Sequence, residues 1–114
     1  MRPLIHPDLA DITLADIFYG LGDPARLAIL RNLLCACDLT CAEAAPDLPK
    51  STMSHHFRIL RDSGLIQTRR DGTAYRSQVR RTELETRFPG LLAAIEANLD
   101  PADAADPGNR RVEA

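Results

Sequence analysis

Residues 50–66 read KSTMSHHFRILRDSGLI, and this stretch decides the fold. Met53, Phe57 and Leu60 recur at helical spacing, which predicts a helix over 50–61 with one buried face. Ser63 and Gly64 would end that helix, because glycine is favoured just beyond a helix C-terminus. The opposite face would carry hydrogen-bonding and basic side chains: Lys50, Ser51, Ser54, His55, Arg58 and Arg61. The stretch therefore predicts a helix with one side for the core and one polar, basic side.

Directly after this helix the hydrophobic period changes from helical to alternating. Residues 65–70 and 73–79 are predicted to form short strands. Asp71 and Gly72 lie between them, and an Asp-Gly pair in this position favours a two-residue type I′ hairpin turn. Three arginines flank the turn: Arg69, Arg70 and Arg76. The sequence thus predicts a β-hairpin, with basic side chains near its tip, beside the basic helix.

Upstream of residue 50, capping signals predict three further helices. An apolar repeat predicts a helix over 14–21. Asp23 followed by Pro24 predicts the start of a helix over 24–35, because proline is well tolerated at the first helical position. Thr40 and Glu43 have the spacing of a capping box, and Pro46 would limit the short helix that follows to about two turns.

Downstream of the hairpin, Thr82 is expected to cap a helical turn and Pro89 to start a last helix over 89–99. Residues 100–114 are mostly small or charged and are predicted to be a disordered tail. The expected organisation is one domain, 1–99, followed by the tail, 100–114. Its order is helix, helix, short helix, helix, hairpin, helix. This order predicts a mainly α (α+β) fold, a winged helix-turn-helix with a two-stranded β-wing.

Charge is distributed unevenly along the chain. The net charge is −2, yet residues 50–81 hold eight basic and two acidic residues, a net charge of +6, and the rest carries −8. A concentrated basic block indicates a polyanionic partner, although a charged face can also be merely solvated. No apolar run approaches the roughly 20 residues of a membrane span, and the N-terminus does not resemble a signal peptide. We therefore expect a cytoplasmic protein with no membrane partner.

A helix-turn-helix places its second helix in the major groove of double-stranded DNA, which gives each polar residue of 50–61 an expected role. Ser51, Ser54 and His55 suit base edges. Lys50, Arg58 and Arg61 suit phosphates or guanine, and Thr52, at the boundary of the polar face, suits a phosphate. His56 lies next to the buried stripe, which favours packing or a backbone hydrogen bond over base contact.

The arginines of the predicted hairpin, Arg69, Arg70 and Arg76, would reach phosphates or the minor groove beside the helix. The alternative is a solvated hairpin whose charged edges discourage aggregation. The basic helix that directly precedes the hairpin favours DNA contact.

Two blocks of the sequence resemble a known family. Residues 22–30 read GDPARLAIL, and together with residues 50–66 they are similar to the ArsR/SmtB family of bacterial repressors. The likeness spans roughly residues 14–99. It implies a homodimer formed through the first and last helices, with two recognition helices on a palindromic operator and repression relieved by an inducer. Five residues match the family's recognition-helix positions: Ser51, Thr52, Ser54, His55 and Arg58.

The residues that would form a sensor site in that family are only partly present in this sequence. A zinc-type site on the last helix needs aspartate and histidine ligands, and residues 89–99 offer only Glu96. Cys35, Cys37 and Cys41 lie close together in sequence but a few residues out of register with the family's thiol motif. On a continuous helix Cys35 and Cys37 would project about 200° apart and could not share an ion.

Three roles stay open for these cysteines. They could ligate a soft metal or arsenite, act in a thiol- or redox-responsive switch, or serve as small buried hydrophobes.

Two other classes of protein fit the sequence less well. No Gly-rich phosphate loop, nucleophile elbow or paired metal-ligand motif is present, so an enzyme is not expected. A winged-helix protein-interaction adaptor that never touches DNA would need an apolar or acidic face on residues 50–61. That face is basic and hydroxylated, and we therefore expect a sequence-specific DNA-binding regulator, released from its operator by an inducer.

Overall fold

The computed structural model describes residues 4–36 and 38–99. Its first two helices, α1 (Leu14–Leu21) and α2 (Pro24–Cys35), have the predicted bounds. Thr13 and Asp16 form a capping box at the start of α1. The Asp23 carboxylate accepts from the amides of Ala25 and Arg26 at the start of α2. These caps satisfy amides that have no partner inside their helix.

The next two helices form the predicted helix-turn-helix. In α3 (Cys41–Ala44) the capping box between Thr40 and Glu43 is present, as expected from the spacing of these two residues. The second helix, α4 (Lys50–Asp62), extends one residue beyond its predicted end. The chain then turns at Gly64, whose φ of +83° explains the glycine there.

The wing differs from its prediction in two respects. Strands β2 (Ile66–Asp71) and β3 (Ala74–Val79) form the hairpin, but a third strand, β1 (Leu39–Thr40), pairs with β3, so the sheet order is β1-β3-β2. The prediction of a type I′ turn over Asp71 and Gly72 was wrong. Asp71 pairs with Ala74 inside the ladder, and the turn residues are Gly72 and Thr73. Only Gly72 has a positive φ there (+64°), whereas type I′ requires one at both positions.

The last two helices start at other residues than expected. Helix α5 (Arg81–Arg87) follows Arg80, so Thr82 is not its cap. Arg80 instead pairs with Glu83, with 2.8 Å between Nε and Oε1. Helix α6 (Leu91–Asn98) begins after Gly90 at φ +81°, so the predicted start at Pro89 was also wrong. A left-handed residue between Pro89 and the helix excludes the proline from the first turn.

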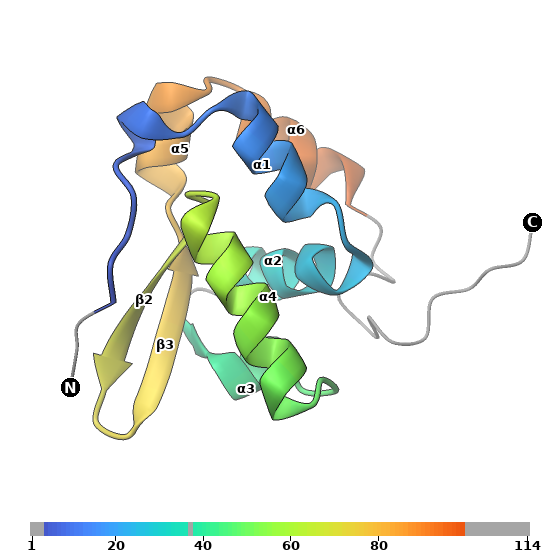
Figure 1. Ribbon diagram of the computed structural model, residues 1–114. Helices are drawn as coiled ribbons and strands as arrows, with labels where there is room; N and C mark the ends of the chain where they lie inside the picture. The colour runs from blue at the N-terminus through green and yellow to red at the C-terminus, as the bar shows by residue number, and fades with distance from the viewer. Residues whose placement is uncertain (1–3, 37, 100–114) are drawn as a thin grey trace, which may run out of the picture.

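All elements pack on one aliphatic core, in which Phe57 is the only fully buried aromatic side chain of the described residues. The fully buried large apolar side chains are Ile17, Ile29, Leu30, Leu33, Phe57, Leu60, Leu65 and Ile66. Figure 1 shows α1, α5 and α6 at one end of the molecule and α3, the hairpin turn and the start of α4 at the other. The fold therefore separates its terminal helices from the tip of the wing.

The segment before α1 is an integral part of this fold. A 3-10 helix (Leu9–Asp11) places Leu9 and Ile12 in the core, and residues 4–8 run beside β2 (Figure 1). His6 Nε2 accepts from the Thr68 amide at 2.9 Å. Arg80 Nη1 donates to the Pro7 carbonyl at 2.8 Å. The predicted tail, 100–114, lies outside the described residues.

Candidate nucleic-acid interface

The polar face of α4 lies on the surface, as its sequence pattern predicted. Lys50, Ser51, Ser54, His55 and Arg58 are exposed, whereas Thr52 and Arg61 are half-buried. Phe57 and Leu60 face the core. Arg58 lies 3.9 Å from Asp62, and both side chains are largely exposed, so this ion pair contributes little and leaves Arg58 available to another anion.

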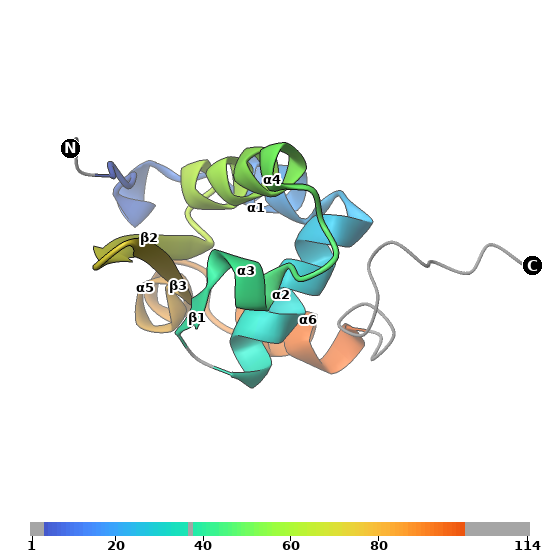
Figure 2. The ribbon, with the colours of Figure 1, turned by 90° about the horizontal axis from the view of Figure 1, so that it is seen from below.

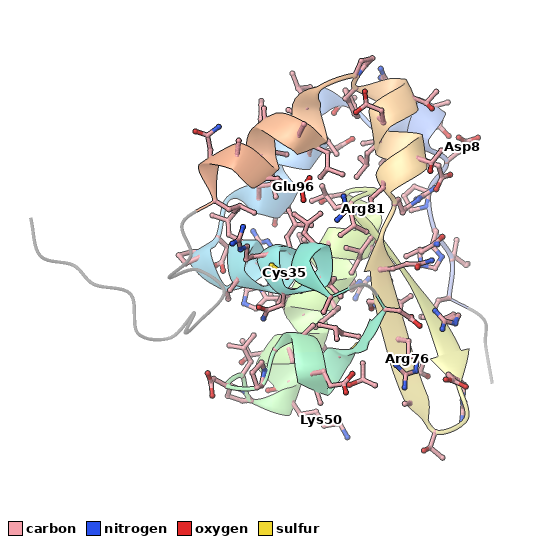
Figure 3. All side chains as sticks on the ribbon, turned by 180° about the vertical axis from the view of Figure 1, so that it is seen from behind. Asp8, Cys35, Lys50, Arg76, Arg81 and Glu96 are labelled. Atoms are coloured by element: carbon pink, nitrogen blue, oxygen red, sulfur yellow. The ribbon has the colours of Figure 1, made fainter. Side chains whose placement is uncertain are left out.

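The N-terminal end of α4 has no side-chain cap. Its N-cap residue is Pro49, which makes no side-chain hydrogen bond to the helix amides. Unpaired amides and the helix dipole make such an end attractive to an anion. Figure 3 shows Lys50 projecting outward at this end, which adds a formal positive charge there. Seen from below, this end of α4 lies beside α3 and faces away from α5 and α6 (Figure 2).

A hollow of about 260 Å³ separates α4 from the wing. It is lined by Leu4, Cys41, Lys50, Met53, Ser54, Phe57, Arg61, Thr68 and Tyr75. Two of these side chains are cationic and none is a carboxylate, while most of the remaining lining is apolar. Met53, which was expected in the buried stripe, is half-buried because it lines this hollow.

The wing arginines have partners within the protein. Arg69 forms a bidentate pair with Asp38, at 2.7 and 2.9 Å, and its guanidinium holds the pKa of Asp38 below its usual range. Arg76, on β3 in Figure 3, donates to Asp71 at 3.0 Å and to the Asp38 carbonyl at 3.2 Å. Arg70 Nε donates to the Gly72 carbonyl. To bind a phosphate, Arg69 or Arg76 would first have to give up these contacts.

Asp38 is a residue that the sequence reasoning missed. It lies before β1 with a φ of +66°, and its carboxylate and carbonyl both point to the wing. Its partners are 31 and 38 residues away in the sequence, so no local pattern could have revealed them.

His56 is buried, with 8% of its surface exposed, as its position beside the apolar stripe indicated. Its Nδ1 atom lies 3.2 Å from Nη1 of Arg26, a buried guanidinium on α2. Arg26 belongs to the stretch GDPARLAIL, whose local pattern gives no sign of this contact. His55 therefore lies on the surface, whereas His56 lies below it in a polar contact with Arg26.

Cys35 and Cys41, two of the three cysteines considered for sensing, lie on different helices. Helix α2 ends at Cys35, which is exposed, whereas Cys41 begins α3 and is half-buried. Cys37 lies outside the described residues. Burial raises the pKa of the Cys41 thiol, and a hydrogen bond with Ser77 offsets this only in part. The thiol is therefore a weaker nucleophile at neutral pH than a free cysteine.

Within residues 4–36 and 38–99, no three His, Cys, Asp or Glu side chains gather to form a metal site. In the same part of the chain, no helix has the length and hydropathy needed to cross a membrane.

Comparison with known proteins identifies this arrangement. A family model described as a helix-turn-helix domain matches residues 21–69. The chain is 37% identical over 84 residues to YceK of Bacillus subtilis, an uncharacterized HTH-type transcriptional regulator, covering 71% of this chain and 84% of that one. It is 34% identical over 99 residues to the arsenical resistance operon repressor of Staphylococcus xylosus, covering 83% and 85%.

A solved structure gives the same result for the fold. The crystal structure of an ArsR family transcriptional regulator matches with a TM-score of 0.58 and 29% identity, over 74% of this chain and 87% of that one. These relatives are transcriptional regulators, and the helix-turn-helix and wing occur here in the same fold. The chain belongs to the ArsR/SmtB family of helix-turn-helix transcriptional regulators.

Proposed function

We propose that the protein is a homodimeric repressor that binds a palindromic operator and leaves it when an inducer binds. The exposed, basic and hydroxylated face of α4, at an uncapped helix N-terminus, is the observation that carries the DNA-binding part. The names of relatives such as the arsenical resistance operon repressor support repression as the mode of control. A regulator of this kind acts where the DNA is, so we place it in the cytoplasm.

In this proposal α4 enters the major groove. Ser51, Ser54 and His55 contact base edges. Lys50, Arg58 and Arg61 contact phosphates or guanine, and Thr52 contacts a phosphate. The hollow beside α4 would then face a strand of the DNA backbone. The wing arginines, Arg69, Arg70 and Arg76, have a supporting role, because internal partners already hold Arg69 and Arg76.

The dimer is supported by apolar side chains that the monomer leaves uncovered. Leu14, Phe18 and Tyr19 of α1 are 45%, 55% and 65% exposed. Ile17 of the same helix and Leu92 and Ile95 of α6 line one apolar crevice, so α1 and α6 adjoin the same part of the core. Large exposed apolar residues grouped on one helix are typical of an interface. Residues 1–99 would form this DNA-binding and dimerisation domain.

The direct test is an electrophoretic mobility shift with DNA from upstream of the protein's own gene, repeated over a range of salt concentrations. We expect binding that weakens steeply as salt rises, because phosphate contacts release counterions. A complete absence of DNA binding at low salt would overturn the proposal and favour a protein-interaction adaptor.

Replacing Arg58 with alanine is expected to weaken binding to operator and to scrambled DNA alike. The slope of log affinity against log salt should fall by about two, because each protomer of the proposed dimer loses one phosphate contact. Fluorescence anisotropy titrations at several salt concentrations measure both quantities. Arg69→Ala is the matched control, with a smaller change in slope, since Asp38 already neutralises Arg69. A loss confined to operator DNA would contradict a phosphate role for Arg58.

Replacing Ser54 or His55 with alanine is expected to relax sequence preference. The ratio of the affinity for operator DNA to that for scrambled DNA should fall about tenfold for each change, because a base contact is lost while the phosphate contacts remain. The same titrations give the ratio. Gln67→Ala, an exposed change on β2, should leave it unaltered. If the ratio were unchanged in the Ser54 and His55 variants, base readout by these residues would be wrong.

A further inference from the structure

One buried guanidinium joins three helices of the fold. Arg26 lies in the first turn of α2 and is 7% exposed. Its Nε donates to the Gly20 carbonyl at 2.8 Å and its Nη2 to the Tyr19 carbonyl at 3.1 Å, both at the C-terminal end of α1. Its Nη1 contacts Nδ1 of His56, in the middle of α4, at 3.2 Å. A buried charge is tolerated only where such partners satisfy it, so this geometry is closely specified.

The same end of α1 touches α4 at a second place. Gly20 packs so closely on Ser63, the residue that ends α4, that an added Cβ would lie 2.6 Å from the Ser63 Oγ. Helix α4 is therefore attached to α1 both at its C-terminal end and, through Arg26, at its middle. A single attachment would leave the helix free to rotate about it, whereas two attachments fix its direction.

The Arg26 contact constrains the protonation state of His56. Arginine can only donate, so His56 Nδ1 has to accept, and a neutral ring then carries its proton on Nε2. Burial lowers the pKa of His56 below its ordinary value of 6.5. Asp23, 4.0 Å from Nε2, opposes this shift, and Arg26 and His55 add to it. Arg26 and Asp23, both from the start of α2, and His55, from α4 itself, are the ionisable groups that act on the ring.

We propose that Arg26 and His56 are positioning residues that set the direction of α4 relative to α1, and that this link holds only while His56 is neutral. The inference rests on the proposed function, in which α1 contributes to the dimer interface. The relative placement of the two recognition helices on a palindrome then depends on how each α4 is held against its own α1. A change at His56 would alter DNA binding without touching the DNA.

The direction of the pH effect follows from linkage. The folded protein holds His56 neutral more strongly than the unfolded chain does, so the unfolded chain binds more protons as the pH falls below the ordinary value. The stabilising contact is complete above about pH 6.5 and is lost as the pH falls toward and through the lowered pKa. Protonation puts an N–H opposite an arginine N–H at 3.2 Å, and the link breaks.

Two substitutions of His56 distinguish the effect of its contact with Arg26 from the effect of filling a buried position. His56→Asn places an amide oxygen near the position of Nδ1 and does not titrate, so it should bind operator DNA like the wild type at about pH 8 and keep that affinity at about pH 5.5. His56→Leu leaves Arg26 Nη1 without an acceptor and should bind about tenfold more weakly at both pH values. Relative to His56→Asn, the wild type should lose affinity progressively as the pH falls below about 6.5, and it should reach the roughly tenfold deficit of His56→Leu only below the lowered pKa of His56.

His6 provides the matched control, because burial lowers its pKa as well, while it lies on the N-terminal segment against β2. His6→Gln keeps an acceptor for the Thr68 amide and should retain the pH dependence of DNA affinity seen in the wild type. Circular dichroism and sedimentation on every variant show that fold and assembly are intact. The link itself is followed without DNA by NMR. The amides of Gly20 and Leu21, which share peptide groups with the Tyr19 and Gly20 carbonyls, should shift as His56 titrates in the wild type, but not in His56→Asn.

These readouts distinguish two failures. If the wild type binds DNA and its pH profile equals that of His56→Asn, or if His56→Leu binds as tightly as the wild type, the positioning role is wrong. If no variant binds DNA but the α1 amides still follow His56, the link exists and the proposed function has failed instead. If these amides do not respond to pH, the inference is overturned whatever the DNA result.

Discussion

Replacing Phe18 with aspartate is expected to dissociate the proposed dimer and to lower operator affinity by about 100-fold or more, because two linked half-site contacts become one. Phe18 and Leu14 lie one turn apart on α1 and are 55% and 45% exposed. Neither belongs to the buried core, which α1 reaches through Ile17. The substitution therefore places a charge in the interface without removing a core contact, and the monomer should stay folded.

Sedimentation at low micromolar concentration measures the assembly, and anisotropy with a full palindrome and with a single half-site measures binding. The half-site affinity of the variant should match that of the wild type. Thr82→Asp adds the same charge on an exposed position of α5 and should leave the dimer intact. A Phe18→Asp protein that still sediments as a dimer would place the interface elsewhere.

Gly64→Ala is expected to lower the free energy of unfolding by about 3 kcal/mol, combining a left-handed backbone conformation with crowding in the core. Gly64 has a φ of +83°, and an added Cβ would lie 2.8 Å from Ile12 Cγ1. Ile12 is itself 3% exposed and has little room to move. Because Gly64 joins α4 to the wing, strain at this point would also loosen the docking of the N-terminal segment.

Urea denaturation measures the loss, and Gly90→Ala separates its two causes. Gly90 has nearly the same φ, +81°, but apart from its two neighbours in the chain no atom of the described residues lies within 4 Å of an added Cβ. It should lose only the backbone part, about 1 kcal/mol. Equal losses at the two positions would mean that Ile12 moves aside at no cost.

The features that could be predicted from sequence are those determined by residues that lie within one helical turn of each other. Thr40 and Glu43 indicate a capping box at the start of α3, because each side chain binds the backbone amide of the other, three residues away. The stripe of Phe57 and Leu60 fixes which face of α4 is buried, and so which residues can meet a partner. The packing of His56 was predictable for the same reason.

The features that were missed depend on residues far apart in the chain. Strand β1 is two residues long, too short for an alternating pattern, and exists because Leu39 and Thr40 pair with Ser77 and Arg76. The contact of Arg26 with His56 spans 30 residues. The boundaries of α5 and α6 were misjudged where a local rule met a competing contact: the Arg80 pair with Glu83, and the left-handed turn at Gly90.

The hydrogen bond from the Thr68 amide to His6 has a consequence for how the sheet meets other molecules. β2 is an outer strand of the order β1-β3-β2, and an outer strand with free amides is a template for a strand from another chain. The imidazole of His6 accepts from one of those amides, and residues 4–8 run alongside the strand (Figure 1). The segment around His6 thus protects this edge, and strand addition at β2 would first have to displace it.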